Sequence, residues 1–133
     1  MLTPDQAALL HEAQSAALGA YAPYSRFRVG AALIAGGATF RGCNVENASY
    51  GLAICAERNA IFHAIAAGHR RIETLALACI DAPADAAASL MMPCGACRQV
   101  MAEFAGPDLP VIIAGVGLRR LRDLLPEAFT LGS

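Results

Sequence analysis

The chain has 133 residues and a net charge of −1, with 56% hydrophobic and 16% charged residues. This length predicts one domain, spanning residues 1–133, that buries roughly two thirds of its unfolded surface. The balanced charge disfavours nucleic-acid binding, which needs a clustered basic surface.

Charged residues fall below the roughly 25% that is usual for soluble domains. We therefore expect part of the apolar surface to be covered in a homo-oligomer. Asp5 and Glu12 lie where a secretory signal would be basic, and no apolar run reaches the roughly 18 residues of a membrane span. Five cysteines, an odd number, favour a reducing compartment. These features predict a cytoplasmic protein without a membrane partner.

The N-terminal segment has the signals of a helix start. Thr3 is the expected N-cap, Pro4 the first helical residue, and Gln6 the partner that closes a capping box. Apolar residues then keep helical spacing as far as Gly19.

The rest of the chain alternates between strand and helix patterns. Residues 29–35 and 39–45 are β-favouring runs around Gly36 and Gly37, which predicts a hairpin. The elements expected after it are a polar loop (46–51), a helix (53–67), a strand (74–80), a loop (81–92), a helix (94–104), a strand (111–114) and a helix (118–125). This alternation predicts an α/β domain with at least four strands.

Two cysteines, Cys94 and Cys97, follow Pro93 at the start of a predicted helix. Residues three apart share a helix face, so both sulfurs point the same way. Free N–H groups of the first turn and the helix dipole stabilise thiolates there. The pair alone fits a redox couple, half of a zinc site or a coincidence.

A third cysteine, Cys55, also lies near the start of a predicted helix. Two helix starts that meet over one ion supply three thiolates and leave the fourth tetrahedral position open, as in catalytic zinc sites. His63 lies eight residues further on, about 12 Å along a helix, which is beyond the reach of a zinc ligand. His11 and His69 have no motif around them, so we expect all three histidines to be surface or packing residues.

Glu57 and Arg58 follow Cys55 closely. Residues two apart on a helix do not face each other, so Glu57 is not expected to bind the same ion. A carboxylate beside metal-bound water is placed for proton transfer. Arg58 shares the face of Cys55 and can offset the thiolate charge, although a surface ion pair is its alternative role. Cys43 and Cys79 have no motif partners and are expected to be small core residues.

Zinc deaminases carry a His-or-Cys, x, Glu signature followed by Pro-Cys-x-x-Cys. The chain contains this pattern, and it resembles the small oligomeric cytidine deaminases of pyrimidine salvage over nearly its whole length. The segments that carry the resemblance are 21–27 (YAPYSRF), 29–32 (VGAA), 42–48 (GCNVENA), 55–58 (CAER), 93–99 (PCGACRQ) and 124–126 (LLP).

The resemblance implies a three-layer α/β/α sandwich around a mixed sheet of about five strands, assembled as a homotetramer with active sites at subunit interfaces. It implies one Zn²⁺ per subunit, held by Cys55, Cys94 and Cys97. The implied reaction is hydrolysis of cytidine and 2′-deoxycytidine to uridine and 2′-deoxyuridine. Zinc activates water for attack at C4 of the base, Glu57 transfers protons, and ammonia leaves.

The resemblance also implies residues that contact the nucleoside. Asn44 and Glu46 would bind the ribose hydroxyl, since an amide and a carboxylate suit a sugar edge. Phe27 would pack against the pyrimidine. The full set assigned to substrate binding is Phe27, Asn44, Glu46, Ala48, Tyr50, Ala56 and Phe129. Of these, Ala48, Tyr50 and Phe129 would serve a neighbouring subunit's site.

One segment departs from the family pattern. Residues 115–117 are shorter than the hairpin expected there, which predicts a truncated or missing last strand. Without the resemblance, Phe27 and Tyr50 are more readily interpreted as plain core aromatics.

Four other functions compete with this interpretation. Blasticidin S deaminase shares the zinc core, but Asn44 and Glu46 favour an ordinary nucleoside. A polynucleotide deaminase is disfavoured by the net charge. A structural zinc module needs four protein ligands, and a thioredoxin-like protein does not need Glu57 beside Cys55.

Overall fold

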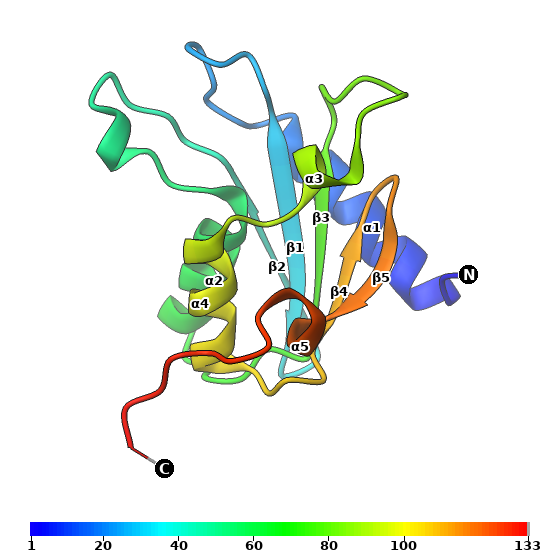
Figure 1. Cartoon of the computed structure of the whole chain (residues 1–133), viewed down its shortest axis with the longest axis vertical. Coiled ribbons are helices and arrows are strands. Elements are labelled where there is room, and N and C mark those ends of the chain that lie inside the picture. Colours follow the sequence, from blue (N-terminus) through cyan, green and yellow to red (C-terminus); the bar gives the residue numbers. More distant parts are fainter. Residues whose placement is uncertain (133) are drawn as a thin grey trace.

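The computed structural model describes residues 1–132, and its centre is a mixed sheet of five strands (Figure 1). The strands are β1 (Val29–Ala35), β2 (Ala38–Cys43), β3 (Thr74–Cys79), β4 (Pro110–Ile113) and β5 (Gly117–Arg120). They lie in the order β2-β1-β3-β4-β5. Only β3 and β4 run parallel, and the other neighbours are antiparallel. The α/β class and the five-stranded mixed sheet are therefore confirmed. Ser133, the last residue of the predicted domain, lies outside the described residues.

Helices cover both faces of this sheet (Figure 1). They are α1 (Pro4–Ala17), η1 (Tyr50–Leu52), α2 (Ala56–Ala66), α3 (Ala88–Met91), α4 (Gly95–Phe104) and α5 (Leu121–Leu124). Side chains of β1 alternate between the layers: Leu33 belongs to the apolar cluster with α2 and α4, and Ala32 to the cluster with α1. This gives the three-layer arrangement. Within residues 1–132, no helix is long and apolar enough to cross a membrane.

The N-terminal half matches the sequence prediction closely. Thr3 and Gln6 form the capping box, with bonds of 3.0 and 3.1 Å between side chain and backbone. Gly36 and Gly37 have φ angles of 57° and 77°. Two consecutive residues with positive φ form a tight turn whose twist matches that of the flanking strands. This two-residue turn joins β1 to β2.

Two glycines let helices lie directly on the sheet. A Cβ atom on Gly42 of β2 would overlap the backbone nitrogen of Ala60 in α2. A Cβ atom on Gly30 of β1 would overlap the backbone of Ala13 in α1, on the opposite face. The close approach at Gly42 fixes the helix that follows Cys55.

The C-terminal half corrects three expectations. Residues 118–125 were predicted as one helix, but the chain first forms β5 (Gly117–Arg120) and only then α5. The shortened segment 115–117 does not remove the last strand, because Gly115 and Gly117, with φ angles of 81° and 115°, turn the chain back along β4. Pairing with β5 satisfies backbone groups at the edge of β4. The predicted loop 81–92 also contains a short helix, α3.

Candidate active site

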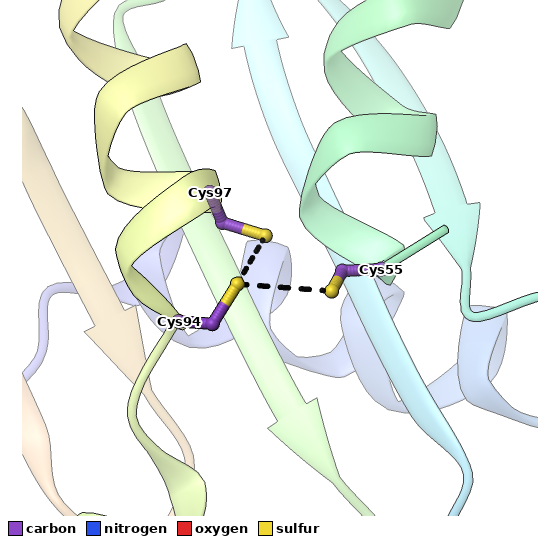
Figure 2. A group of neighbouring side chains, drawn as sticks. All are labelled: Cys55, Cys94 and Cys97. Atoms are coloured by element: carbon purple, nitrogen blue, oxygen red, sulfur yellow. Dashed lines mark hydrogen bonds between the residues drawn. The ribbon is translucent and has the colours of Figure 1, made fainter. Parts of the chain in front are cut away.

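Two helix starts meet beside the sheet and bring three thiols together (Figure 2). Cys55 is the N-cap of α2 and Cys94 the N-cap of α4, both with extended backbone. The helix that was predicted over residues 53–67 begins three residues later, at Ala56, so Cys55 lies at its N-terminus. Cys97 lies in the first turn of α4. The Sγ atoms are 3.9 Å apart for Cys55 and Cys94, and 3.3 Å apart for Cys94 and Cys97.

This donor set fits zinc. Tetrahedral zinc–sulfur bonds of about 2.3 Å place two sulfurs about 3.8 Å apart, and all three Sγ atoms here lie within 4.8 Å of one another. Soft thiolates favour zinc over harder cations. Among residues 1–132, the cluster has three protein ligands, so it leaves a coordination position for water, as catalytic zinc sites do.

Arg58 lies against the thiols, as its spacing from Cys55 predicted. Its Nη2 donates to the Cys55 sulfur at 3.5 Å. A hydrogen bond from Cys97, together with the contact to Arg58, lowers the pKa of Cys55 to about 5. The hydrogen bond between the two cysteines raises the pKa of Cys97. The thiolate form of Cys55, which binds metal, is thus stabilised by its neighbours.

Glu57 is the second residue of α2, and its side chain is only 4% exposed. Burial raises the pKa of this carboxyl to about 7. Buried carboxylates are rare unless they are paired or have a function. The charge of Cys55 and a hydrogen bond with Cys97 also act on this carboxyl, so it lies beside the thiol cluster.

The histidines lie in other environments. The rings of His63 and His69 both pack edge-on against Phe40, and His11 is exposed. Cys43 and Cys79 are half-buried free thiols, and burial raises the pKa of Cys79 to about 11. The histidines thus have the packing and surface roles expected for them, whereas Cys43 and Cys79, expected in the core, are only half-buried and belong to neither apolar cluster.

Asn44 and Glu46 hold the loop that carries Phe27. The Asn44 side chain accepts from the N–H of Val29 at 2.8 Å and donates to the carbonyl of Phe27 at 2.9 Å. The Glu46 carboxylate accepts from the N–H groups of Tyr24 and Ser25 at 3.0 and 3.1 Å, and from the Ser25 hydroxyl. The hydrogen bond from that hydroxyl lowers the pKa of Glu46.

A pocket of about 310 Å³ opens between this loop and η1. Its lining residues are Tyr24, Ser25, Glu46, Asn47, Tyr50 and Ala53. Of the residues predicted to bind substrate, the structure thus brings Glu46 and Tyr50 to one cavity. Ala56 is buried as the first residue of α2 and Phe27 is half-buried, whereas Ala48 is exposed.

Phe129 lies apart from that pocket, along α4, where its backbone contacts Gln99. The sequence prediction missed Gln99 as a contact, although it stands in the quoted segment 93–99. It also missed Ser25 as the partner of Glu46. These contacts join residues 30 and 21 positions apart, so no local pattern signals them.

Comparison with known families gives one consistent result. A family model described as the cytidine and deoxycytidylate deaminase zinc-binding region matches residues 3–113. A cytidine deaminase of Mycobacterium tuberculosis is 52% identical over 120 residues, which cover 90% of this chain and 85% of that protein. One from Halalkalibacterium halodurans is 46% identical over 131 residues, or 95% of each chain.

Solved structures show the same similarity. The crystal structure of cytidine deaminase from Mycobacterium tuberculosis has a TM-score of 0.82 at 42% identity, and the match covers 97% of this chain and all of that one. The structure from Burkholderia pseudomallei has a TM-score of 0.80 at 46% identity, covering 96% of this chain and all of that one. The range of the family model, residues 3–113, includes both helix starts that carry the thiols.

Proposed function

The chain belongs to the family of cytidine and deoxycytidylate deaminases, and we propose that it hydrolyses cytidine and 2′-deoxycytidine to uridine and 2′-deoxyuridine, releasing ammonia. It is a zinc-dependent hydrolytic deaminase. The observation that carries the proposal is the three-thiol cluster with buried Glu57 beside it. The relatives are named cytidine deaminases, which leaves blasticidin S deaminase as the less favoured alternative.

When bound by Cys55, Cys94 and Cys97, zinc supplies a water of lowered pKa close to the base. Glu57 is proposed to move the protons. Its carboxylate takes one proton from the attacking water and delivers it to N3 of the pyrimidine. It then takes the second proton from the new hydroxyl group at C4 and delivers it to the amino group, which leaves as ammonia. The burial of Glu57 supports this role, because a side chain fixed in a helix start and shielded from solvent exchanges protons with the bound base rather than with bulk water.

Arg58 is proposed to adjust the charge of the site. Three thiolates and one zinc ion sum to −1, which opposes ionisation of water. The guanidinium bond to the Cys55 sulfur draws charge away from that ligand. The Nε atom of Arg58 is buried without a hydrogen-bond partner among the described residues, so the contacts of this guanidinium are made through its Nη atoms.

Asn44 and Glu46 are proposed to bind the sugar, and Phe27 the pyrimidine. Asn44 uses one acceptor site and one N–H to hold the loop, which leaves a second lone pair and a second N–H. The Glu46 carboxylate also keeps one of its roughly four lone-pair sites beyond its three bonds. Both can therefore anchor the loop and still reach a hydroxyl group.

The proposed assembly is a homotetramer in which Ala48, Tyr50 and Phe129 serve sites of neighbouring copies. Tyr50 is 80% exposed and Phe129 is 68% exposed, and aromatic side chains so far in solvent suit an interface. We place the enzyme in pyrimidine salvage in the cytoplasm, where free nucleosides and reduced thiols are both present.

The direct experiment is a substrate panel with the purified zinc-loaded protein. Cytidine, deoxycytidine, cytosine, blasticidin S and single-stranded DNA are incubated separately, and the ultraviolet change of deamination is followed. Turnover of the two nucleosides is expected. Turnover of blasticidin S alone would move the assignment to the alternative, and activity only on DNA would exclude both.

A further inference from the structure

The helix that carries two of the thiols also holds the C-terminal segment. Directly after Cys97, the Arg98 side chain donates from Nε to the carbonyl of Pro93 at 2.8 Å and from Nη1 to the carbonyl of Leu124 at 2.7 Å. One guanidinium thus joins the residue before Cys94 to the end of α5. The geometry of the thiols and the course of the C-terminal segment depend on the same side chain.

Gln99 makes a second and more specific attachment. Its Nε2 donates to the carbonyl of Phe129 at 2.8 Å, and its Oε1 accepts from the N–H of Phe129 at 3.3 Å. The side-chain amide therefore pairs with one backbone residue as a neighbouring strand would. Residues 125–132, called here the C-terminal strap, lie outside the helices and strands, so this pairing replaces the ladder that would otherwise fix them.

The backbone of the strap is attached to α4 through Gln99, but two of its apolar side chains are exposed to solvent. Phe129 is 68% exposed and Leu131 is 90% exposed. A gap of about 280 Å³ separates the strap from α4, and it is lined by Gln99, Ala102, Glu103, Phe129, Thr130 and Leu131. A tail that only completed the core would bury these side chains, whereas this one fixes the main chain and leaves the ring free to contact another molecule.

We infer that Gln99 is a positioning residue that acts through Phe129, holding the strap so that the ring is presented to the nucleoside site of a second copy of the chain. This inference rests on the proposed function, in which Phe129 contributes to a neighbouring site. Ordering a free strap costs conformational entropy, and a clamp that orders it beforehand leaves more of the ring's contact energy for substrate binding.

Gln99→Met tests the clamp, because methionine keeps the size and helix propensity of glutamine but loses both polar atoms. For cytidine, KM is expected to rise about three- to tenfold, the range for losing one or two neutral hydrogen bonds. The value of kcat should stay within about twofold and zinc at one per chain. Hydrogen exchange of the strap amides should accelerate in the zinc-loaded variant.

Phe129→Ala and the double variant separate an action through the ring from a general loss of stability. If Gln99 acts through Phe129, the double variant should have nearly the same kcat/KM as Phe129→Ala alone. Gln99→Glu keeps an acceptor for the N–H of Phe129 but places a negative carboxylate against the carbonyl of Phe129. Its KM for cytidine should therefore rise as in Gln99→Met. Glu103→Ala lies one turn further along α4, lines the same gap, and should match wild type.

Multiplicative effects of Gln99→Met and Phe129→Ala on kcat/KM would overturn the inference, as would unchanged hydrogen exchange of the strap. Failure of the proposed function gives a different result, because the wild-type protein itself would then not turn over cytidine. In that case the exchange measurement still decides whether Gln99 holds the strap.

Discussion

Glu57 is the side chain on which the proposed chemistry depends most. Glu57→Ala should keep one zinc per chain, because the carboxylate is not among the thiol ligands, and should lower kcat by about 10²–10⁴ or more, the usual contribution of a positioned acid or base. Metal analysis and steady-state kinetics on the same preparation measure both. Glu103→Ala, an acidic residue away from the thiols, is the matched control. A kcat for Glu57→Ala near the wild-type value would remove the proton-transfer role.

Cys97 is fully buried and lies in the first turn of α4. Cys97→Ser should lose tight zinc binding, since a hydroxyl is a harder and much less acidic ligand than a thiol. Chelator competition measures the zinc affinity. Cys79→Ser, at a half-buried cysteine outside the cluster, should keep its zinc. Wild-type affinity in Cys97→Ser would contradict the assignment of ligands.

Arg28 and Asp81 give the protein a measurable pH dependence of stability. Hydrogen bonds from the Arg28 side chain and backbone, at 2.8 to 2.9 Å, lower the pKa of Asp81 to about 2. The ordinary value in an unfolded chain is about 3.9. A carboxylate with a lowered folded-state pKa stabilises the fold above the unfolded value, and this contribution is lost as pH falls from about 4 toward 2.

The prediction concerns the difference in Tm between wild type and Asp81→Asn, since other carboxylates affect both proteins equally. This difference should be constant from pH 7 to about pH 5 and should shrink at lower pH. Thermal unfolding followed by circular dichroism measures it. A difference that stays the same down to pH 3 would show that the ion pair does not set the pKa of Asp81.

At the scale of elements, the contact of Gly42 with α2 should couple the sheet to the metal site. Gly42→Ala forces α2 away from β2, and overpacking of this kind costs about 1–3 kcal/mol in the free energy of unfolding. Because Cys55 is the N-cap of α2, the zinc affinity of the Gly42→Ala variant should fall as well. Gly30→Ala causes a similar overlap with α1 on the other face and should lower stability while keeping zinc. Equal zinc affinities in the two variants would contradict this coupling.

The elements also show what local sequence determines. The hairpin at Gly36 and Gly37 and the capping box at Thr3 were predicted correctly because each depends on residues next to one another. The strand β5 was predicted as helix because the leucines at 118, 121 and 125 have helical spacing. Its real state depends on pairing with β4, a tertiary contact that overrides local preference.

The site divides in the same way. The thiols, Glu57 and Arg58 were predicted from short motifs at two helix starts, where spacing along the helix determines geometry. The clamp between Gln99 and Phe129 joins positions 30 residues apart and could be found only in the folded chain.

At the scale of the whole molecule, the proposed sharing of sites between copies predicts complementation. Glu57→Ala subunits keep Phe129, and Phe129→Ala subunits keep Glu57. Unfolding the two variants together and refolding them with zinc should therefore restore sites that neither variant has alone, and activity should exceed the sum of the two separate preparations. Activity equal to that sum, at every mixing ratio, would show that Phe129 does not act on a neighbouring copy.

One zinc ion, held by three thiolates, is expected to support cytidine deamination in this chain. Titration of zinc into metal-free protein, with the rate of uridine formation measured at each point, tests it most directly. The rate should rise in proportion to bound zinc and level off at one ion per chain. Full activity without metal, or no activity at one zinc per chain, would contradict the claim.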